Sequence, residues 1–158
     1  MWGRASSGSM GPLIQAGDRV LVERVRPNRV RFGDVVLFRS AEGLVIHRVV
    51  GKRWNHGQLV FLQKGDDNLE AGRVSAAHVL GRARAVEHEE RLVNLVSGVG
   101  RAMQIALAFH SLSTLALKRA GELVVRRLPL IHRRGLGRYF DRLARAVPRF
   151  FVKALRPR

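Results

Sequence analysis

Cysteine is absent from this chain of 158 residues, and aromatic residues are few. Without cysteine the chain has no disulfide, no thiol nucleophile and no Cys-ligated zinc or iron–sulfur site. Aromatic residues make up 6% of the chain and leave Trp2 and Trp54 as candidates for stacking against bases, so no platform for single-stranded nucleic acid is visible. The hydrophobic share of 46% is normal for a globular protein and argues against disorder of the whole chain.

Long uncharged runs are also scarce, and acidic residues nearly vanish from the second half. The longest stretch without a formal charge, residues 102–117, has 16 residues, whereas a bilayer-spanning helix needs about twenty apolar ones. Residues 1–90 hold 14 basic and 10 acidic residues, a net charge of +4, and residues 91–158 hold 15 basic and 2 acidic residues, a net charge of +13. The chain therefore divides into a mixed-charge domain, residues 1–90, and a cationic tail, residues 91–158. The total of +17 favours phosphate-bearing partners, either nucleic acid or an anionic lipid surface.

The first domain is predicted to be built from short strands. Runs rich in β-branched residues and bounded by Gly, Asp, Asn and Pro are typical of strands joined by turns. Five such runs occupy residues 19–25, 34–38, 43–50, 58–63 and 79–86. No helical pattern of 10–15 residues separates them, which argues against alternating strands and helices. We therefore predict a mainly β core, antiparallel and partly closed into a barrel.

The tail changes to a helical pattern. Residues 92–117 are mostly apolar and borderline for a membrane span, because Arg101 within them costs roughly 3 kcal/mol on insertion scales. Farther on, residues 136–151 place Leu, Tyr, Phe and Val near one helical face and four arginines mostly away from it. Such a basic amphipathic helix fits either a membrane surface or ordinary packing on the domain. We predict an α-helical basic tail, with both roles left open.

Three residues are candidates for chemistry. Ser9 lies in SSGSMGP, residues 6–12, a composition that by itself is typical of a loop. His47 lies inside an apolar strand run, and is either a core or edge histidine bonded to the backbone or a general base that titrates near neutral pH. Asp66 lies in KGDDN, residues 64–68, and is either a turn residue or a carboxylate that orients the imidazole.

Two further residues near Ser9 are candidates for binding. A serine hydroxyl is a poor nucleophile until a base takes its proton and nearby donors stabilise the oxyanion. Ser7 can offer its hydroxyl to that oxyanion, while Ser9 offers its own N–H. We therefore name Ser7 and Met10 as candidate oxyanion and substrate-binding residues.

Five short motifs follow one another between residues 9 and 82. They are SMGP at residues 9–12 with Gly17-Asp18 following, GDVV at 33–36, HRVV at 47–50, KGDDN at 64–68 and VLGR at 79–82. In order and spacing they resemble the signal peptidases of the S26 type over residues 6–86. The resemblance implies a serine endopeptidase without metal or cofactor, in which Ser9 attacks a peptide carbonyl and His47 acts first as base and then as acid. Typical bacterial signal peptidases carry lysine at the position of His47. In having histidine there, this chain is similar to the archaeal and endoplasmic-reticulum branch of the family.

The resemblance also implies a substrate and a third catalytic residue. Substrates of the family are secreted precursor polypeptides with small residues before the cut, bound as an extended strand. Asp66 is the implied third residue, in preference to Asp67. The second aspartate that the branch usually carries about six residues later is replaced by Gly72.

Membrane association is expected, by one of three routes. Family enzymes place a transmembrane helix before the nucleophile, and eight residues precede Ser9 here. Either the start lies upstream of Met1, or residues 92–117 span the membrane with the basic tail in the cytoplasm, or a cytoplasmic peptidase touches the membrane through its basic helices.

Two rival functions come from other classes. A β-module without catalysis would bind nucleic acid or an anionic membrane through the Arg-rich tail, with a steep salt dependence for nucleic acid. Metal-dependent chemistry through the six histidines has less support, because no pair has metal-ligand spacing on an identifiable element.

Overall fold

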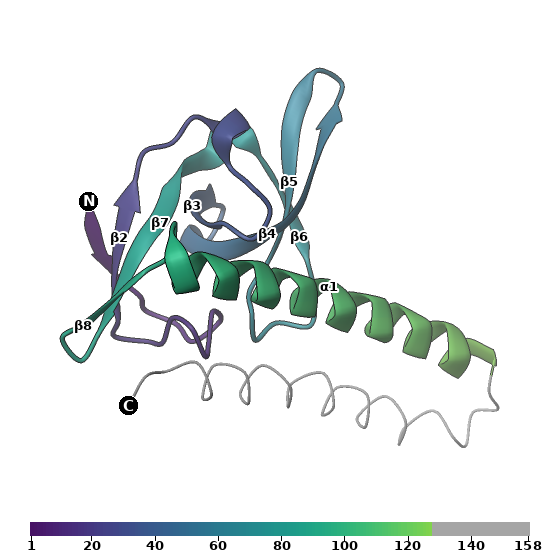
Figure 1. The fold of residues 1–158 in the computed structure, drawn as a ribbon. Helices are drawn as coiled ribbons and strands as arrows, with labels where there is room; N and C mark the ends of the chain where they lie inside the picture. Colours follow the sequence, from purple (N-terminus) through teal and green to yellow (C-terminus); the bar gives the residue numbers. More distant parts are fainter. Residues whose placement is uncertain (128–158) are drawn as a thin grey trace.

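The computed structural model describes residues 1–127 and shows an eight-stranded antiparallel sheet followed by one long helix (Figure 1). The strands are β1 (Trp2–Arg4), β2 (Arg19–Glu23), β3 (Val35–Ser40), β4 (Gly43–Asn55), β5 (Gln58–Lys64), β6 (Gly72–Ser75), β7 (Val79–His88) and β8 (Arg91–Asn94). Short 3-10 turns η1 (Pro27–Arg29) and η2 (Ala76–His78) precede β3 and β7, and α1 (Gly98–Arg127) follows β8. All five predicted strands are present. The three additional strands are three or four residues long, too short for a pattern to reveal.

The strands pair in the order β1-β2-β7-β3-β4-β5-β6, and β8 pairs with β7. Every pairing is antiparallel, so the predicted antiparallel β core is confirmed. The hydrogen-bonded ladder does not close, because β1 and β6 are its two ends. The sheet also continues through β8, past position 90.

The longest strand, β4, forms a hairpin with β5 whose far end projects beyond the rest of the sheet (Figure 1). Asn55 pairs with Gln58, so the loop has two residues, His56 and Gly57. Both have positive φ, 46° and 75°, which suits the right-handed twist of the flanking strands. A register shift lies between Val49 and Gly51.

Hydrophobic side chains form two clusters, one on each side of β3. Val35 and Leu37 belong to the first cluster, whereas Val36 and Phe38 belong to the second, as the two-residue period of a strand requires. The first cluster also holds Met10 from the loop before β2. Both faces of this central strand are therefore covered.

Helix α1 packs its first half against the β-domain, and its later turns extend past the sheet (Figure 1). Leu107 joins the first hydrophobic cluster, and Gln104 and Ser111 are also buried. The helix approaches Gly33 so closely that a Cβ there would lie 3.2 Å from the Gln104 carbonyl oxygen.

The structure does not support a membrane span in residues 92–117. Positions 92–94 belong to β8, and the helix beyond them buries polar side chains against the domain. Within residues 1–127, no helix is both long and apolar enough to cross a membrane. The amphipathic segment predicted at residues 136–151 lies outside the described residues.

Candidate active site

Ser9 lies in the loop between β1 and β2, where the chain makes a tight turn. The N–H of Gly11 donates to the Gly8 carbonyl at 2.8 Å, and Met10 is only 2% exposed in the first hydrophobic cluster. Ser9 itself is half-buried, and its hydroxyl lies 3.4 Å from that of Ser7. The buried Met10 therefore anchors the turn and leaves the two serine hydroxyls accessible.

The backbone of Ser9 is held by the turn that follows β5. The N–H of Asp67 donates to the Ser9 carbonyl at 3.0 Å. A Cβ at Gly65 would lie 2.7 Å from the same oxygen, far inside ordinary contact distance, so this close approach requires glycine. Two predicted motifs, around residues 9 and 65–67, are thus in direct contact.

His47 lies on β4, opposite Val36 of β3. Its Nδ1 hydrogen-bonds Oε1 of Gln63 on β5, and its ring centroid is 6.1 Å from that of Phe38. Because an amide oxygen only accepts, this contact places the proton on Nδ1 and leaves the lone pair on Nε2.

The pKa of His47 is lowered from its ordinary value, chiefly because burial penalises the imidazolium. The Gln63 hydrogen bond and the negative charge of Asp66 oppose this shift, and the positive charge of Lys64 adds to it. The net effect keeps the imidazole neutral at pH 7, the form that a general base requires.

The strand register brings the Ser9 loop to the end of the ladder at His47. Arg48 of β4 pairs with Lys64 of β5 in antiparallel register. The next position on the β5 side, Gly65, therefore comes opposite His47. Gly65 is also the residue against which the Ser9 carbonyl packs. Within residues 1–127, no hydrogen bond joins the Ser9 hydroxyl to the imidazole, since their side-chain partners are those named above.

Asp66 is buried and bonded to Arg48. Nε of Arg48 donates to Oδ1 at 2.7 Å and its terminal nitrogen to Oδ2 at 2.6 Å, a bidentate pair with both side chains almost completely buried. The carboxylate therefore acts on His47 through its charge, whereas the hydrogen-bond partner of the imidazole is Gln63. Asp67, the other candidate, is exposed and contributes its backbone N–H.

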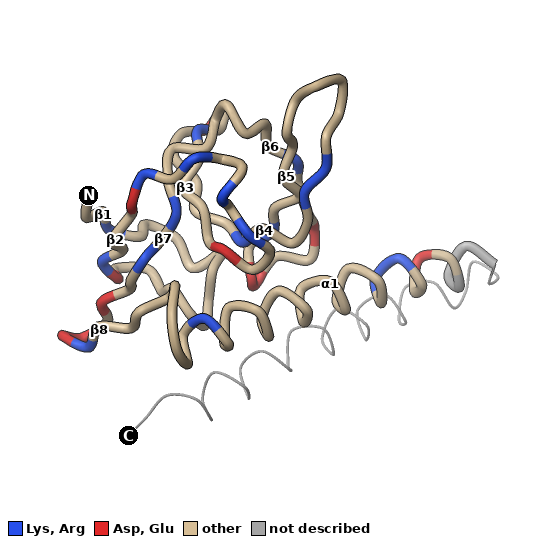
Figure 2. Tube along the Cα trace, turned by 45° about the horizontal axis from the view of Figure 1, so that its top comes forward, with Lys and Arg blue, Asp and Glu red and all other residues tan. Residues whose placement is uncertain are grey.

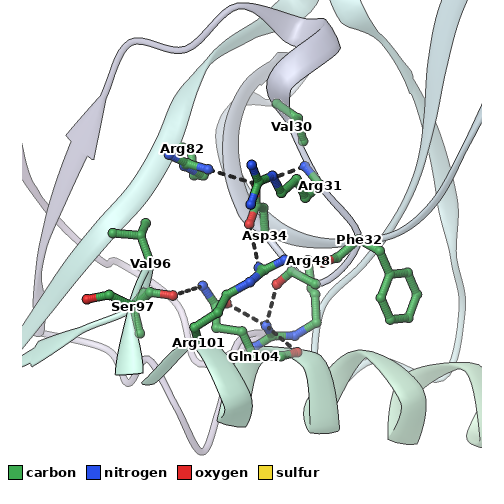
Figure 3. Close-up of polar contacts among 12 residues, drawn as sticks. Val30, Arg31, Phe32, Asp34, Arg48, Arg82, Val96, Ser97, Arg101 and Gln104 are labelled. Atoms are coloured by element: carbon green, nitrogen blue, oxygen red, sulfur yellow. Dashed lines mark hydrogen bonds and ion pairs between the residues drawn. The ribbon is translucent and has the colours of Figure 1, made fainter. Parts of the chain in front are cut away.

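Arg48 also ties the site to α1 (Figure 3). Its second terminal nitrogen donates to the Gly33 carbonyl at 2.9 Å and to Oε1 of Gln104 at 2.6 Å. Nearby, Asp34 accepts a hydrogen bond of 2.6 Å from Arg101 of the same helix. Helix α1 is thus fixed to the β-domain through one buried and one partly buried polar contact.

Sequence reasoning missed three of these residues: Gln63, Lys64 and Gln104. Strand alternation places Gln63 on the face of Leu59 and Phe61, a signal for a buried polar partner. Lys64 is buried with its Nζ 3.2 Å from the Gly65 carbonyl, and burial lowers its pKa. No local pattern points to Gln104, because its partner lies 56 positions away.

A cavity of about 310 Å³ opens beside Ser9. Ser7 and Ser9 lie on its wall together with apolar side chains, among them Met10, Leu37 and Ile46. β1, an edge strand, borders the same cavity. The arrangement offers a serine hydroxyl next to an apolar space for a side chain. Within residues 1–127, no three His, Asp or Glu side chains gather closely enough to hold a metal ion.

Comparison with known proteins points to one group. The chain is 36% identical over 91 residues to the "Signal peptidase complex catalytic subunit SEC11C" of Homo sapiens, Mus musculus and Canis lupus familiaris. Each match covers 49% of this chain and 47% of the relative, so the chain spans about half the length of these relatives. No protein-family model matches the chain. The resemblance seen in the motifs is confirmed: over about half its length, this chain is a distant homologue of signal peptidase catalytic subunits.

Proposed function

We propose that this chain is a serine endopeptidase of signal-peptidase type that cleaves precursor polypeptides. The observation that carries the proposal is the position of Ser9. Its backbone is held against the turn after β5, which follows in register with His47 on β4, and Ser9 lines a mainly apolar cavity. The homology to signal peptidase catalytic subunits supports the same chemistry.

In the proposed reaction, Ser9 Oγ attacks the peptide carbonyl while Nε2 of His47 takes the hydroxyl proton. The Ser9 N–H and the Ser7 hydroxyl, 3.4 Å from the nucleophile, donate to the oxyanion. The imidazolium then gives its proton to the departing amine as the C–N bond breaks. Water, deprotonated by the same imidazole, hydrolyses the ester and regenerates the serine.

The substrate is proposed to bind as an extended strand along the cavity. β1 lines the cavity and has one unpaired edge, which suits pairing with an extended peptide. The apolar side chains Met10 and Leu37 favour a small apolar residue just before the cut. Asp66 acts here as a positioning residue, because it holds the turn that supports Ser9 and its charge favours the imidazolium.

We also propose that the chain associates with a membrane, and that the basic residues of the tail, residues 91–158, contribute to this association. Carbonate washing of isolated membranes is the corresponding test, because it removes proteins bound only at the surface and leaves spanning proteins in place.

The decisive experiment is cleavage of a model secretory precursor by the full chain in detergent. We expect Ser9→Ala and His47→Ala each to lower the cleavage rate by at least about 10³-fold. Ser97→Ala and His78→Ala, which change exposed residues outside the site, serve as matched controls and should retain the wild-type rate. Cleavage by Ser9→Ala at the wild-type rate, or no cleavage of several precursors by the wild type, would overturn the proposal. A β-module without catalysis would then be the better description.

A further inference from the structure

A second and larger cavity, of about 810 Å³, is lined mainly by basic residues that the proposed peptidase does not use. Six cations line it: Arg24, Arg26, Arg29, Arg31, Lys52 and Arg82. We call this group the basic cavity. In Figure 2, basic positions gather on the loop after β2. Glu23, the last residue of β2, precedes this loop.

The backbone that presents these arginines is fixed. The N–H of Arg29 donates to the Arg26 carbonyl at 2.9 Å, and Val30, fully buried, anchors the loop in the second hydrophobic cluster. The N–H of Arg31 donates to Asp34 at 2.9 Å. Nζ of Lys52 reaches the Val30 carbonyl at 3.4 Å, so the β4–β5 hairpin and the loop form one surface.

Most of this positive charge has no counterion among residues 1–127. Glu23 is the one carboxylate that the described residues contribute to the cavity wall. It is already bonded to Arg82 at 2.6 Å and to Arg84 at 3.1 Å, and these contacts lower its pKa. Within the described part of the chain, none of the four loop arginines at positions 24, 26, 29 and 31 forms an ion pair. Like charges held together on a fixed loop repel one another, and a polyanionic partner would offset that repulsion.

An exposed tryptophan stands next to the basic cavity. Trp54 follows Lys52 by two residues on β4, so both side chains emerge on the same face of the strand. Trp54 is 69% exposed on the hairpin that projects from the sheet (Figure 1), and Arg53 beside it is exposed as well. Tryptophan flanked by basic residues on a projecting hairpin is typical of proteins that sit at the lipid–water interface.

We propose that the basic cavity and Trp54 form a docking surface for the phosphate headgroups of an anionic phospholipid membrane. The arginines are exposed and spread over a wide, open cavity, which suits many headgroups better than one enclosed phosphate. One neighbouring aromatic residue suits an interfacial anchor, whereas single-stranded nucleic acid needs a series of stacking platforms. None of the residues that form this surface belongs to the basic tail, and the proposal does not depend on peptidase activity.

The test measures binding of the full chain to phosphatidylcholine vesicles with and without about one quarter phosphatidylserine. The variant replaces Arg24, Arg26 and Arg29 with Gln, and a control removes three charges elsewhere by Arg39→Gln, Arg73→Gln and Arg119→Gln, all at exposed positions. We expect the first variant to bind the anionic vesicles about 100-fold more weakly than the wild type. The control should lose less than about tenfold, since only general attraction changes.

A spectroscopic readout separates this surface from the tail. In Trp2→Phe, Trp54 is the remaining tryptophan, and its emission should shift to shorter wavelength with anionic vesicles and stay unchanged with phosphatidylcholine alone. Equal losses in the two triple variants, or unchanged Trp54 emission on anionic vesicles, would overturn the proposal. Quenching of Trp54 by a single-stranded oligonucleotide, with no response to vesicles, would assign the surface to nucleic acid instead.

Discussion

His47 and Arg48 are neighbours on β4, yet their surroundings differ in every respect that matters for chemistry. His47 is half-buried, and among residues 1–127 its imidazole has one side-chain hydrogen bond, to Gln63. Arg48 is completely buried, and its guanidinium donates to a carboxylate, two carbonyls and an amide oxygen. A buried charge is tolerated when its donors all have partners, whereas a group that exchanges protons needs one atom left unbonded. Of these two consecutive residues, His47 is suited to proton transfer and Arg48 to structural support.

The two roles meet in the turn after β5. Arg48 holds the Asp66 carboxylate, and the next residue, Asp67, holds the carbonyl of Ser9. The structural residue therefore positions the proposed nucleophile, and the fixed turn keeps Ser9 at the end of the ladder that bears His47. Variants of Arg48 should therefore mainly lower stability, whereas variants of His47 should mainly lower the cleavage rate.

The largest effect on stability is expected from Arg48→Met. It leaves the Asp66 carboxylate buried without a partner, which should lower the free energy of unfolding by about 3–5 kcal/mol. Urea unfolding followed by circular dichroism measures the change. Arg53→Met, on the exposed part of the same strand, is the matched control and should stay within about 0.5 kcal/mol of the wild type.

Replacing both partners sharpens this prediction. Arg48→Met combined with Asp66→Leu removes both charges, so the double variant should be more stable than Arg48→Met alone. A double variant whose loss equals the sum of the two single losses would show that the residues do not act as a pair. His47→Ala, by contrast, should abolish cleavage with a much smaller loss of stability.

The strands of this fold are predictable from local pattern, whereas the polar network is not. Turn residues and β-branched runs locate five strands, because alternation is a local property. The extension of β4 to Asn55 escapes prediction, since Lys52, Arg53 and Trp54 are exposed on a hairpin that leaves the core. Because these residues are all exposed, their sequence has no alternation of apolar and polar residues that would reveal a strand.

The candidate site divides in the same way. The motifs nominate Ser9, His47 and Asp66 as candidates. In the structure, the N–H of Asp67, the residue after Asp66, donates to the Ser9 carbonyl. The partner of Asp66 depends on register across β4 and β5, and that of Gln104 on the path of α1. Neither partner can be recognised from a few consecutive residues. The sequence therefore suggests that the Asp66 carboxylate orients the imidazole, whereas in the structure this carboxylate is hydrogen-bonded to Arg48.

Gly65→Ala is expected to have an intermediate effect that reaches both stability and activity. The added Cβ would lie 2.7 Å from the Ser9 carbonyl and from Nδ2 of Asn68, so the turn must shift. Such crowding costs about 1–3 kcal/mol, and the displaced serine should lower the cleavage rate. Gly3→Ala, where nothing lies within 4 Å of the added carbon, is the control for stability. Normal cleavage by Gly65→Ala would show that the contact between turn and nucleophile is dispensable.

The smallest expected effect is a shift in pH dependence on changing Gln63. Burial keeps the pKa of His47 below its ordinary value, so cleavage should rise with pH through an acidic limb as the imidazole loses its proton. The Gln63 hydrogen bond raises that pKa, and Gln63→Leu should therefore move the limb to lower pH. Gln63→Glu adds a negative charge beside the ring and should move it to higher pH.

These opposite shifts distinguish tuning of His47 from simple damage. Lost packing would lower the rate of both variants without moving their acidic limbs in opposite directions. Gln58→Glu, an exposed change at the other end of the same strand, controls for the added charge and should leave the limb in place. Limbs that do not move in either Gln63 variant would mean that His47 is not the group whose ionisation limits cleavage.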